Sequence, residues 1–311
     1  MSDIQLNIWQ RIGLELLWGF SCFMHLMPRW VRFGVFQPFI YVLLRLVRYR
    51  RRVVWQNIRH SFPEMSDRQI RQIVHKFYAI LAEVVVCTIS LAGAKPSDSE
   101  PYIEWDNGEE HRERVAGKDW VAMAVHFGCW EYFLLWSWYV DADFMAVYHP
   151  LRSAVFECYY RRLRNHSPHI KQVAMKDTMR YYLRNRATAG GMCLGLISDQ
   201  SPRLTADTVW YDFLNRKTAF VEGGEKIALK FHLPVYFCHT RRIKAGHYAV
   251  RFDQIYDGVE DISDKEIIRR YVERLEAMIK EQPELWLWSH NRWRHTPEKQ
   301  AVKFGKSTLE E

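Results

Sequence analysis

Residues 121–133 read VAMAVHFGCWEYF. The apolar run has the length of one buried strand and ends at His126, and it is followed by Gly128 and a Trp-rich segment that begins near Glu131. Folds that alternate strands and helices place their reactive groups at the carboxyl ends of strands. The stretch therefore predicts a strand that carries His126 at its carboxyl end, with Glu131 in the first turn of the next helix.

His126 and Glu131 suit general-base chemistry. A hydroxyl is a weak nucleophile until its proton is removed, and histidine is the usual base near neutral pH. A carboxylate on the other ring nitrogen fixes the tautomer and stabilises the imidazolium. We therefore predict that His126 is the base and that Glu131 orients it. Taken alone, the H-x-x-x-x-E pattern is weak and fits a surface histidine and a glutamate at a helix start better.

The segments around this stretch alternate between short apolar runs and helical periods. Strands that alternate with helices are typical of an α/β layered domain. We expect residues 118–297 to form it, with a mixed, mostly parallel sheet flanked by helices. The expected strands are 120–125, 144–148, 192–198, 234–239 and 248–252, and the expected helices are 153–165, 176–186, 223–232 and 264–281.

The first 52 residues are largely apolar and end in a cluster of arginines. Residues 16–28 contain no charged side chain other than a histidine, and a second apolar run covers 33–44. Neither run reaches the ~20 residues of a spanning helix, so we predict a kinked, interfacial, membrane-associating segment broken at Pro28. The alternative is two buried core helices. The arginines suited to anionic head groups are Arg45, Arg48, Arg50, Arg51 and Arg52.

The segments on either side of the predicted α/β domain are simpler. Residues 53–117 form a helical lead-in, in which Ser66 and Gln69 make a capping box for a long amphipathic helix over 66–92. The apolar stripe of this helix indicates core packing. The polar tail, 298–311, is expected to be frayed.

Composition narrows the classes of partner. The 311-residue chain has a formal net charge of +8 and 13 Trp, which favours anionic partners and a membrane interface. Zinc-finger spacing and RNA-binding aromatic motifs are absent, so we expect no nucleic acid. The six cysteines are scattered, which suggests a reducing compartment, and we expect neither a metal nor another cofactor.

Two further polar pairs lie near predicted element ends. Asp199 and Gln200 end a buried strand, level with His126 if the strands are parallel, and fit acceptor positioning, loop support or a polar turn. Gly223 and Gly224 open a helix whose N–H groups suit a phosphate or an oxyanion.

Basic residues mark two more candidate sites. His290 and Arg292 follow a Trp-rich apolar segment and fit a structural or substrate-binding role, with surface residues as the alternative. Arg164 lies in a cluster with Arg152, Arg161 and Arg162, which suits phosphates or an acidic carrier protein. The alternative for this cluster is the solvated face of a helix.

Six sequence blocks lie in a fixed order over almost the whole chain. They are N-x-x-x-x-F-P at 57–63, HFGCWE at 126–131, AVYHPLRSAVFECYYRRLR at 146–164, LGLISDQSP at 194–202, FLNRKTAFVEGGEKIALKFHLPV at 213–235 and LWLWSHNRWR at 285–294. Together they resemble the bacterial lipid A late acyltransferase family, of the lauroyl or myristoyl type, which belongs to the glycerolipid acyltransferases with an H-x-x-x-x-D/E motif. Within these blocks, FLN and EKIALK look closest to versions from Bacteroidetes-like bacteria.

The resemblance implies a glycerolipid acyltransferase-like fold and an O-acyltransferase of lipid A and lipopolysaccharide biosynthesis. The implied donor is acyl carrier protein, or acyl-CoA, and the implied acceptor is a phosphorylated glycolipid or phospholipid. The implied location is the cytoplasmic face of the cell inner membrane. Val125, His149 and Asn165 depart from the family pattern, which leaves chain length and acceptor open. The alternatives are an acyltransferase for a lysophospholipid or lyso-aminolipid, and a non-catalytic basic membrane-binding protein.

Overall fold

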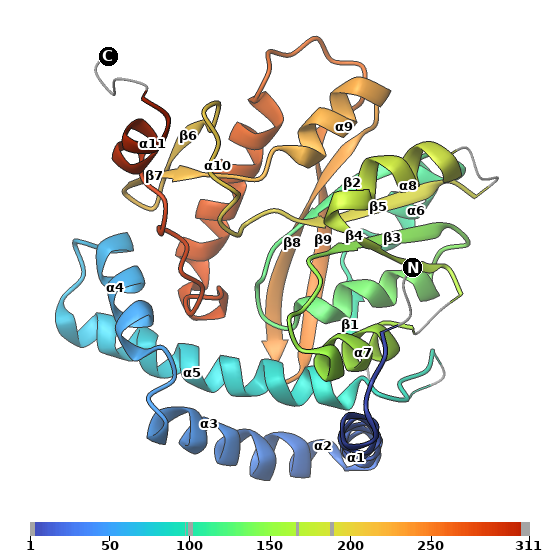
Figure 1. The fold of residues 1–311 in the computed structure, drawn as a ribbon, viewed down its shortest axis with the longest axis vertical. Helices are drawn as coiled ribbons and strands as arrows, with labels where there is room; N and C mark the ends of the chain where they lie inside the picture. The colour runs from blue at the N-terminus through green and yellow to red at the C-terminus, as the bar shows by residue number, and fades with distance from the viewer. Residues whose placement is uncertain (1–3, 97, 99–101, 166–167, 187–189, 306–311) are drawn as a thin grey trace.

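A seven-stranded sheet forms the centre of the molecule (Figure 1). The computed structural model describes residues 4–96, 98, 102–165, 168–186 and 190–305. The strand order is β1-β9-β8-β2-β5-β3-β4, and the five strands from β8 to β4 are parallel, whereas β9 pairs antiparallel with β8. The predicted mixed, mostly parallel sheet is confirmed. The strands are β1 (Ile103–Trp105), β2 (Trp120–Ala124), β3 (Asp143–Tyr148), β4 (Ile170–Ala174), β5 (Met192–Ile197), β8 (Val235–Lys244) and β9 (His247–Tyr256).

The register of β2 against β5 places the ends of the two strands level. All five residues of β2 are buried, as expected of a central parallel strand covered on both faces. Ala124 pairs with Ile197 in parallel register. The same offset, continued by two residues, brings His126 opposite Asp199.

Helices cover both faces of the sheet. On one face, α9 (Gly223–Phe231) and α10 (Glu266–Glu281) pack against the odd-numbered residues of β2 and β8, where Tyr271 lies edge-on to Phe237. On the other face lie α6 (Gly108–Val115) and the 3₁₀ helix η2 (Trp130–Trp138), with His111 against Trp120. Further elements are α7 (Ala154–Leu163), η3 (Met175–Asp177), α8 (Thr178–Asn185) and η4 (Pro283–Leu285).

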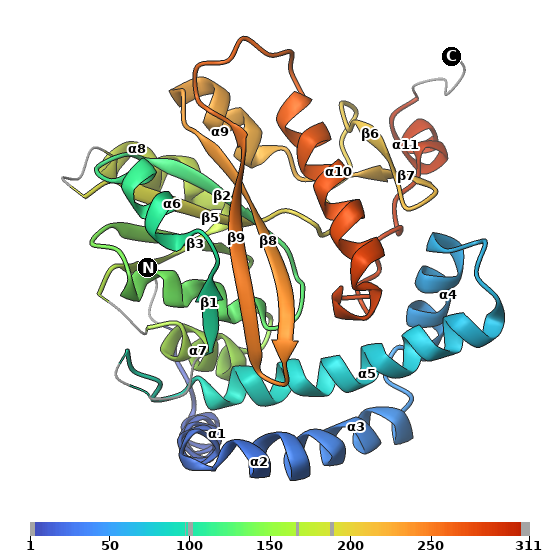
Figure 2. The same ribbon diagram turned by 180° about the vertical axis from the view of Figure 1, so that it is seen from behind.

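The N-terminal helices form a layer across the end of the sheet at which β8 ends (Figures 1 and 2). Helix α5 runs past the end of β8, and α1, α2 and α3 lie on its outer side. Pro28 stands at the predicted break between α1 and α2. The helices are α1 (Ile8–Leu26), α2 (Arg29–Val31), the π-helical η1 (Arg32–Phe36), α3 (Gln37–Leu46), α4 (Arg51–Ser61) and α5 (Asp67–Ser90).

Helix α5 is a core helix with the composition of a membrane span. The predicted capping box of Ser66 and Gln69 starts it. Among the described residues it is the helix long and apolar enough to cross a membrane, yet 67% of its apolar window is buried inside the protein. The bent pair 29–46 and 51–61 passes the same test together, with an angle of 94° between its parts.

The C-terminal segment is more ordered than expected. Residues Pro297–Phe304 form α11, where a frayed tail was predicted. The side chain of Gln300 explains the difference: it accepts a hydrogen bond from the Trp210 indole (2.6 Å) and donates to three carbonyls of residues 205–208. Trp210 starts the small antiparallel hairpin of β6 (Trp210–Phe213) and β7 (Arg216–Ala219). Residues 306–311 of the expected tail lie outside the described residues.

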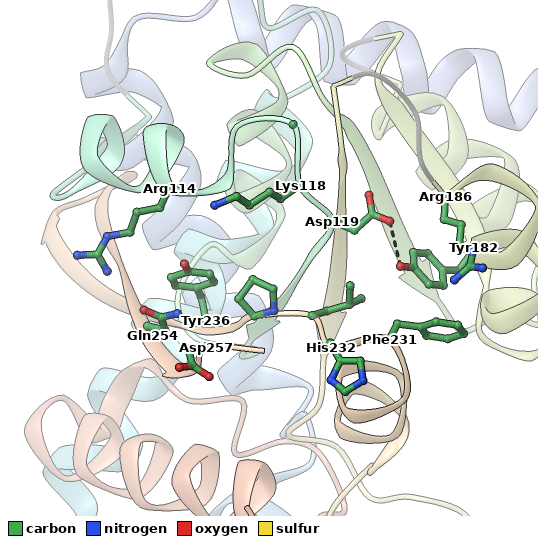
Figure 3. Close-up of a pocket in the computed structure, with 13 residues that line it drawn as sticks. Arg114, Lys118, Asp119, Tyr182, Arg186, Phe231, His232, Tyr236, Gln254 and Asp257 are labelled. Atoms are coloured by element: carbon green, nitrogen blue, oxygen red, sulfur yellow. Dashed lines mark hydrogen bonds between the residues drawn. The ribbon is translucent and has the colours of Figure 1, made fainter. Parts of the chain in front are cut away.

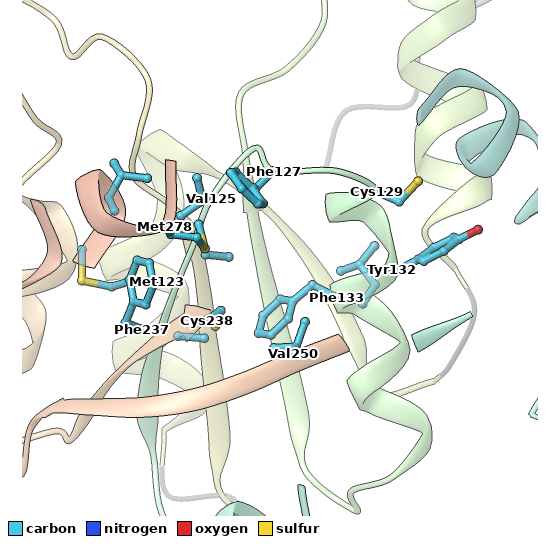
Figure 4. Packing of buried hydrophobic residues seen from close by; sticks show 14 of the residues in the cluster. Met123, Val125, Phe127, Cys129, Tyr132, Phe133, Phe237, Cys238, Val250 and Met278 are labelled. Carbon is cyan, nitrogen blue, oxygen red and sulfur yellow. The ribbon is translucent and has the colours of Figure 1, made fainter. Parts of the chain in front are cut away.

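The hydrophobic core extends into the loop that follows β2 (Figure 4). Phe127 and Cys129 are buried in it, Phe127 near Val125 and Met278, and Cys129 near Tyr132. Val125 and Phe127 are both buried, and the His126 side chain between them lies at the edge of the sheet where β2 ends.

Candidate active site

His126 and Asp199 form the polar centre of the site. Nδ1 of His126 lies 2.7 Å from Oδ1 of Asp199, and the backbone N–H of His126 donates to Oδ2 at 3.2 Å. The His126 side chain is 16% exposed and that of Asp199 is 2% exposed. The carboxylate therefore lies inside the protein and the imidazole reaches from it toward solvent.

The surroundings of Asp199 keep it ionised. Burial alone would raise its pKa, but the nearby His126, the hydrogen bonds from His126 and Trp286, and the charge of Arg292 outweigh burial and lower the pKa. The Trp286 indole donates to Oδ2 at 2.8 Å. An ionised carboxylate accepts hydrogen bonds only, so Nδ1 of His126 carries a proton and donates it to Asp199. The second ring nitrogen, Nε2, then presents its lone pair.

Glu131 has a different partner from the predicted one. Its carboxylate accepts hydrogen bonds from Nε (2.9 Å) and Nη2 (2.5 Å) of Arg164, and the Glu131 side chain is 7% exposed. The prediction that Glu131 orients His126 is wrong for this structure, because Asp199 already occupies Nδ1. Burial would lower the pKa of Arg164, but the charge and hydrogen bonds of Glu131 outweigh this and raise it.

The Glu131–Arg164 pair joins the loop after β2 to the end of α7. The Arg164 guanidinium also lies over the rings of Tyr160 (5.2 Å) and Tyr148 (5.9 Å). Its charge is therefore neutralised and its planar faces are partly covered. This guanidinium is less suited to binding a phosphate than an exposed one, and better suited to holding the loop in place.

Gly128 fixes the path of the loop between His126 and Glu131. It has φ +53°, and a Cβ there would come within 2.2 Å of Cε1 of Tyr248. Tyr248 cannot move away easily, because it is buried and its hydroxyl donates to Glu83 of α5 at 2.6 Å. The site loop therefore rests on a ring that α5 holds from below.

The segment 286–292 closes another side of the site, and α4 holds it. The Asn57 side chain donates to the carbonyls of Trp288 and His290, both at 2.9 Å. His290 lies near His126 and Asp199, and burial lowers its pKa to about 4, so its ring is neutral at pH 7. Arg292 is 2% exposed and donates to the carbonyl of Ala219 at 2.6 Å.

Gly223 and Gly224 do not join this group of residues. A Cβ on Gly224 would lie 2.8 Å from Leu196 Cδ1, so this glycine permits close packing of α9 on the sheet. Glu222 occupies the N-cap position without a side-chain capping hydrogen bond. Glu225 lies in the first turn, where its carboxylate accepts a hydrogen bond from the Ile267 N–H at 2.9 Å. Two acidic side chains at this helix start argue against a phosphate site.

The cavity in Figure 3 is separate from these residues. It measures ≈ 790 Å³ and lies near the amino ends of β2 and β8, beside Asp119 and Pro234. None of the predicted site residues lines it. Within the residues that the structure describes, no three His, Cys, Asp or Glu side chains come together as a metal site.

Two indoles at the site were not predicted. Trp286 holds Asp199, and Trp130 lies edge-on to the His126 ring with 5.1 Å between centroids. Both belong to Trp-rich segments whose composition indicated apolar packing. An indole N–H on a buried carboxylate depends on how distant segments meet, so the sequence offered no signal for it.

The α/β sheet, the histidine at its carboxyl edge and the family comparison identify the chain as an acyltransferase. The family model of bacterial lipid A biosynthesis acyltransferases matches residues 2–295, and the chain belongs to this family. No curated protein matches the sequence. Among solved structures, the 1-acyl-sn-glycerophosphate acyltransferase from Thermotoga maritima is similar over 89% of this chain and 99% of that chain, with 15% identity and a TM-score of 0.34.

Proposed function

We propose that this acyltransferase moves a fatty acyl chain from the thioester of acyl carrier protein to a hydroxyl of a lipid A precursor, with His126 as the general base. The observation that carries the proposal is the 2.7 Å contact of Asp199 with Nδ1 of His126. It leaves Nε2 as the basic nitrogen, at the carboxyl edge of the sheet. Family membership supports the lipid A acceptor.

The reaction follows from this arrangement. Nε2 of His126 takes the proton of the acceptor hydroxyl as its oxygen attacks the thioester carbonyl carbon. Asp199 stabilises the imidazolium that forms. When the intermediate collapses, the C–S bond breaks, the proton passes from Nε2 to sulfur, and the products are an ester and a thiol.

We assign positioning roles to Glu131 and Arg164. Their ion pair ties the loop that carries His126 to the end of α7, so losing either partner displaces the base. Glu131→Gln should therefore lower kcat while leaving the contact of Asp199 with His126 intact. His290 and Arg292 line and support the same edge, and we propose that neutral His290 contacts the substrate.

We further propose that the N-terminal layer attaches the enzyme to the cytoplasmic face of the inner membrane. Fifteen of the 24 exposed large hydrophobic side chains among the described residues lie within 8–49, so this layer is where an apolar phase would bind. Exposed arginines follow directly, including Arg48, Arg51 and Arg52. Full burial contributes about 1.5–3 kcal/mol per large apolar side chain and each arginine about 1 kcal/mol, so the apolar term is the larger.

A reconstituted assay tests the function. Purified enzyme receives dodecanoyl-acyl carrier protein or dodecanoyl-CoA, with a lipid A precursor, a lysophospholipid or a lyso-aminolipid as acceptor. We expect transfer to the lipid A precursor, and a rate lowered about 100-fold or more by His126→Ala. A His126→Ala rate within a few-fold of wild type would exclude His126 as the general base. Transfer to another lipid alone, or a deletion strain with unchanged lipid A and a missing aminolipid or phospholipid, would exclude the lipid A precursor as the acceptor.

Membrane flotation tests the attachment. Phe20 and Phe39 are 43% and 66% exposed on the N-terminal layer, and the double change Phe20→Glu, Phe39→Glu should weaken binding to vesicles that contain anionic phospholipid. Val302→Glu is the matched control, because Val302 is 89% exposed but belongs to α11. Release of the wild type by high salt alone would show that the arginines dominate.

A further inference from the structure

Gln200 makes a second contact with the base. Its side-chain Nε2 lies 3.2 Å from Nε2 of His126. It directly follows Asp199, so one turn after β5 supplies groups to both ring nitrogens of one histidine. The carboxylate holds Nδ1, and the amide faces the nitrogen that takes the proton.

The direction of this hydrogen bond follows from the tautomer. Asp199 accepts the proton of Nδ1, so the neutral ring has a lone pair on Nε2. Of the two ends of the Gln200 amide, the NH₂ group can donate to that lone pair, whereas the carbonyl oxygen would be repelled by it. The Gln200 NH₂ group therefore lies where the acceptor hydroxyl must bind to give its proton to Nε2 of His126.

The backbone of the neighbouring loop has few donors left for a developing oxyanion. The N–H of Phe127 donates to the carbonyl of Val125 (2.8 Å), that of Gly128 to Leu285 (2.9 Å), and that of Trp130 to the carbonyl of Gly128 (3.1 Å). In many acyl-transfer enzymes such backbone groups stabilise the tetrahedral intermediate. Here these three are committed to holding the loop.

We propose that Gln200 is a catalytic residue whose side-chain amide stabilises the oxyanion of the tetrahedral intermediate. The inference rests on the proposed function, since it requires His126 to act as the base. When the acceptor hydroxyl binds, it replaces Gln200 on Nε2 of His126. The freed N–H then lies about one hydrogen-bond length from the reacting atoms and turns to the thioester carbonyl oxygen.

The step balances with these groups alone. The hydroxyl oxygen forms a bond to the carbonyl carbon, its proton goes to Nε2 of His126, and the C=O electron pair moves to oxygen, where the Gln200 N–H donates. Collapse restores C=O, breaks the C–S bond and returns the proton from Nε2 to sulfur. Gln200 exchanges no proton, so an isosteric group without N–H cannot replace it.

Kinetics of three variants test this. Gln200→Leu removes the donor, and Gln200→Met removes it while keeping a side chain of similar length. Gln172→Leu is the matched control, because Gln172 is also half-buried and its amide donates to one acceptor within the protein, the carbonyl of Arg161 at 2.7 Å. The assay measures kcat and KM with dodecanoyl-acyl carrier protein, and thermal unfolding of each variant.

We expect both Gln200 variants to lose about 10²–10³ in kcat, with KM changed only a few-fold and unfolding temperatures close to that of Gln172→Leu. If Gln200→Leu does not fold, Gln200→Met decides. A kcat within a few-fold of the control, or a loss confined to KM, would overturn the proposal. A failure of the base itself appears separately, as an unchanged rate in His126→Ala.

Discussion

Replacing Asp199 by Asn tests the central geometric claim, that Asp199 rather than Glu131 orients the base. The carboxylate oxygens accept from His126 Nδ1 at 2.7 Å, the His126 backbone N–H at 3.2 Å and the Trp286 indole at 2.8 Å. An asparagine has one acceptor oxygen and one NH₂ group. Because the backbone and indole donors stay, the amide oxygen turns to them and the NH₂ group faces Nδ1.

That rearrangement forces the wrong tautomer on His126. Nδ1 must then accept, so the proton moves to Nε2, which can no longer take one from the acceptor hydroxyl. The corresponding change in a Ser-His-Asp enzyme lowers kcat about 10⁴-fold, and we expect a loss on the order of 10³–10⁴ here, equivalent to about 4–5.4 kcal/mol of barrier. Stability should fall by about 1–3 kcal/mol, since a buried charge-assisted hydrogen bond is lost.

Two measurements separate the alternatives. Steady-state acyl transfer gives kcat, and ¹⁵N NMR of histidine-labelled protein reports the His126 tautomer, assigned by comparison with His126→Gln. Asp199→Asn should shift the proton to Nε2, whereas Glu131→Gln should lower kcat without changing the tautomer. A tautomer unchanged in Asp199→Asn but altered in Glu131→Gln would refute the assignment, as would an Asp199→Asn rate within a few-fold of wild type.

Three other substitutions follow from the structure. Gly128→Ala places a Cβ against the Tyr248 ring at positive φ, so we expect at least a 10-fold loss of kcat with far-ultraviolet circular dichroism unchanged; full activity would contradict the rigid support. Burial is the chief cause that lowers the pKa of His111 to about 3. Between pH 6.5 and 3 the unfolded chain therefore binds a proton that the folded protein does not, so the free energy of unfolding decreases as the pH is lowered. His111→Phe should flatten that slope by about 1.4 kcal/mol per pH unit in urea titrations, and an unchanged slope would contradict it. Asn57→Ala removes both hydrogen bonds to the carbonyls of Trp288 and His290 and should lower the free energy of unfolding by about 2 kcal/mol in the same titrations. A decrease below about 0.5 kcal/mol would contradict the view that Asn57 supports this segment.

The sheet could be predicted from the sequence because its central strands are continuous apolar runs. Residues 120–125 and 192–198 have no polar side chain before their ends, which is typical of parallel strands covered on both faces. The level ends of these two strands also followed from parallel pairing. Short edge strands such as β1 and β4 were not predicted, because three to five residues of mixed polarity have no clear period.

The partner of His126 could not be predicted in the same way. A carboxylate five residues away in sequence is a local candidate, whereas Asp199 is 73 residues away and reaches the ring only through the register of β2 and β5. Sequence indicated that Asp199 and Gln200 are level with the base. It did not indicate that Arg164 engages Glu131, which depends on where α7 ends.

The N-terminal layer also contributes to the site, which neither its apolar composition nor its arginines suggested. Arg50, at the start of α4, donates to the carbonyl of Ser289 at 2.9 Å, within the segment that holds Asp199 through Trp286. Helix α5 holds Tyr248 beneath Gly128 through Glu83. The same helices therefore face the apolar outer layer on one side and fix the site on the other.

A truncation tests a further link between the N-terminal layer and the site, made by α1 rather than by α4 or α5. Removing residues 1–44 takes away twelve of the 24 exposed large hydrophobic side chains among the described residues, so the protein should bind membranes less tightly. It also removes Ser21, whose hydroxyl lies 2.8 Å from that of Tyr159 on α7, five residues before Arg164. We therefore expect the truncated enzyme to be poorly active even on a detergent-dispersed acceptor, where membrane attachment is not needed. Full activity there would mean that the layer serves attachment alone, and that α7 keeps Arg164 on Glu131 without it.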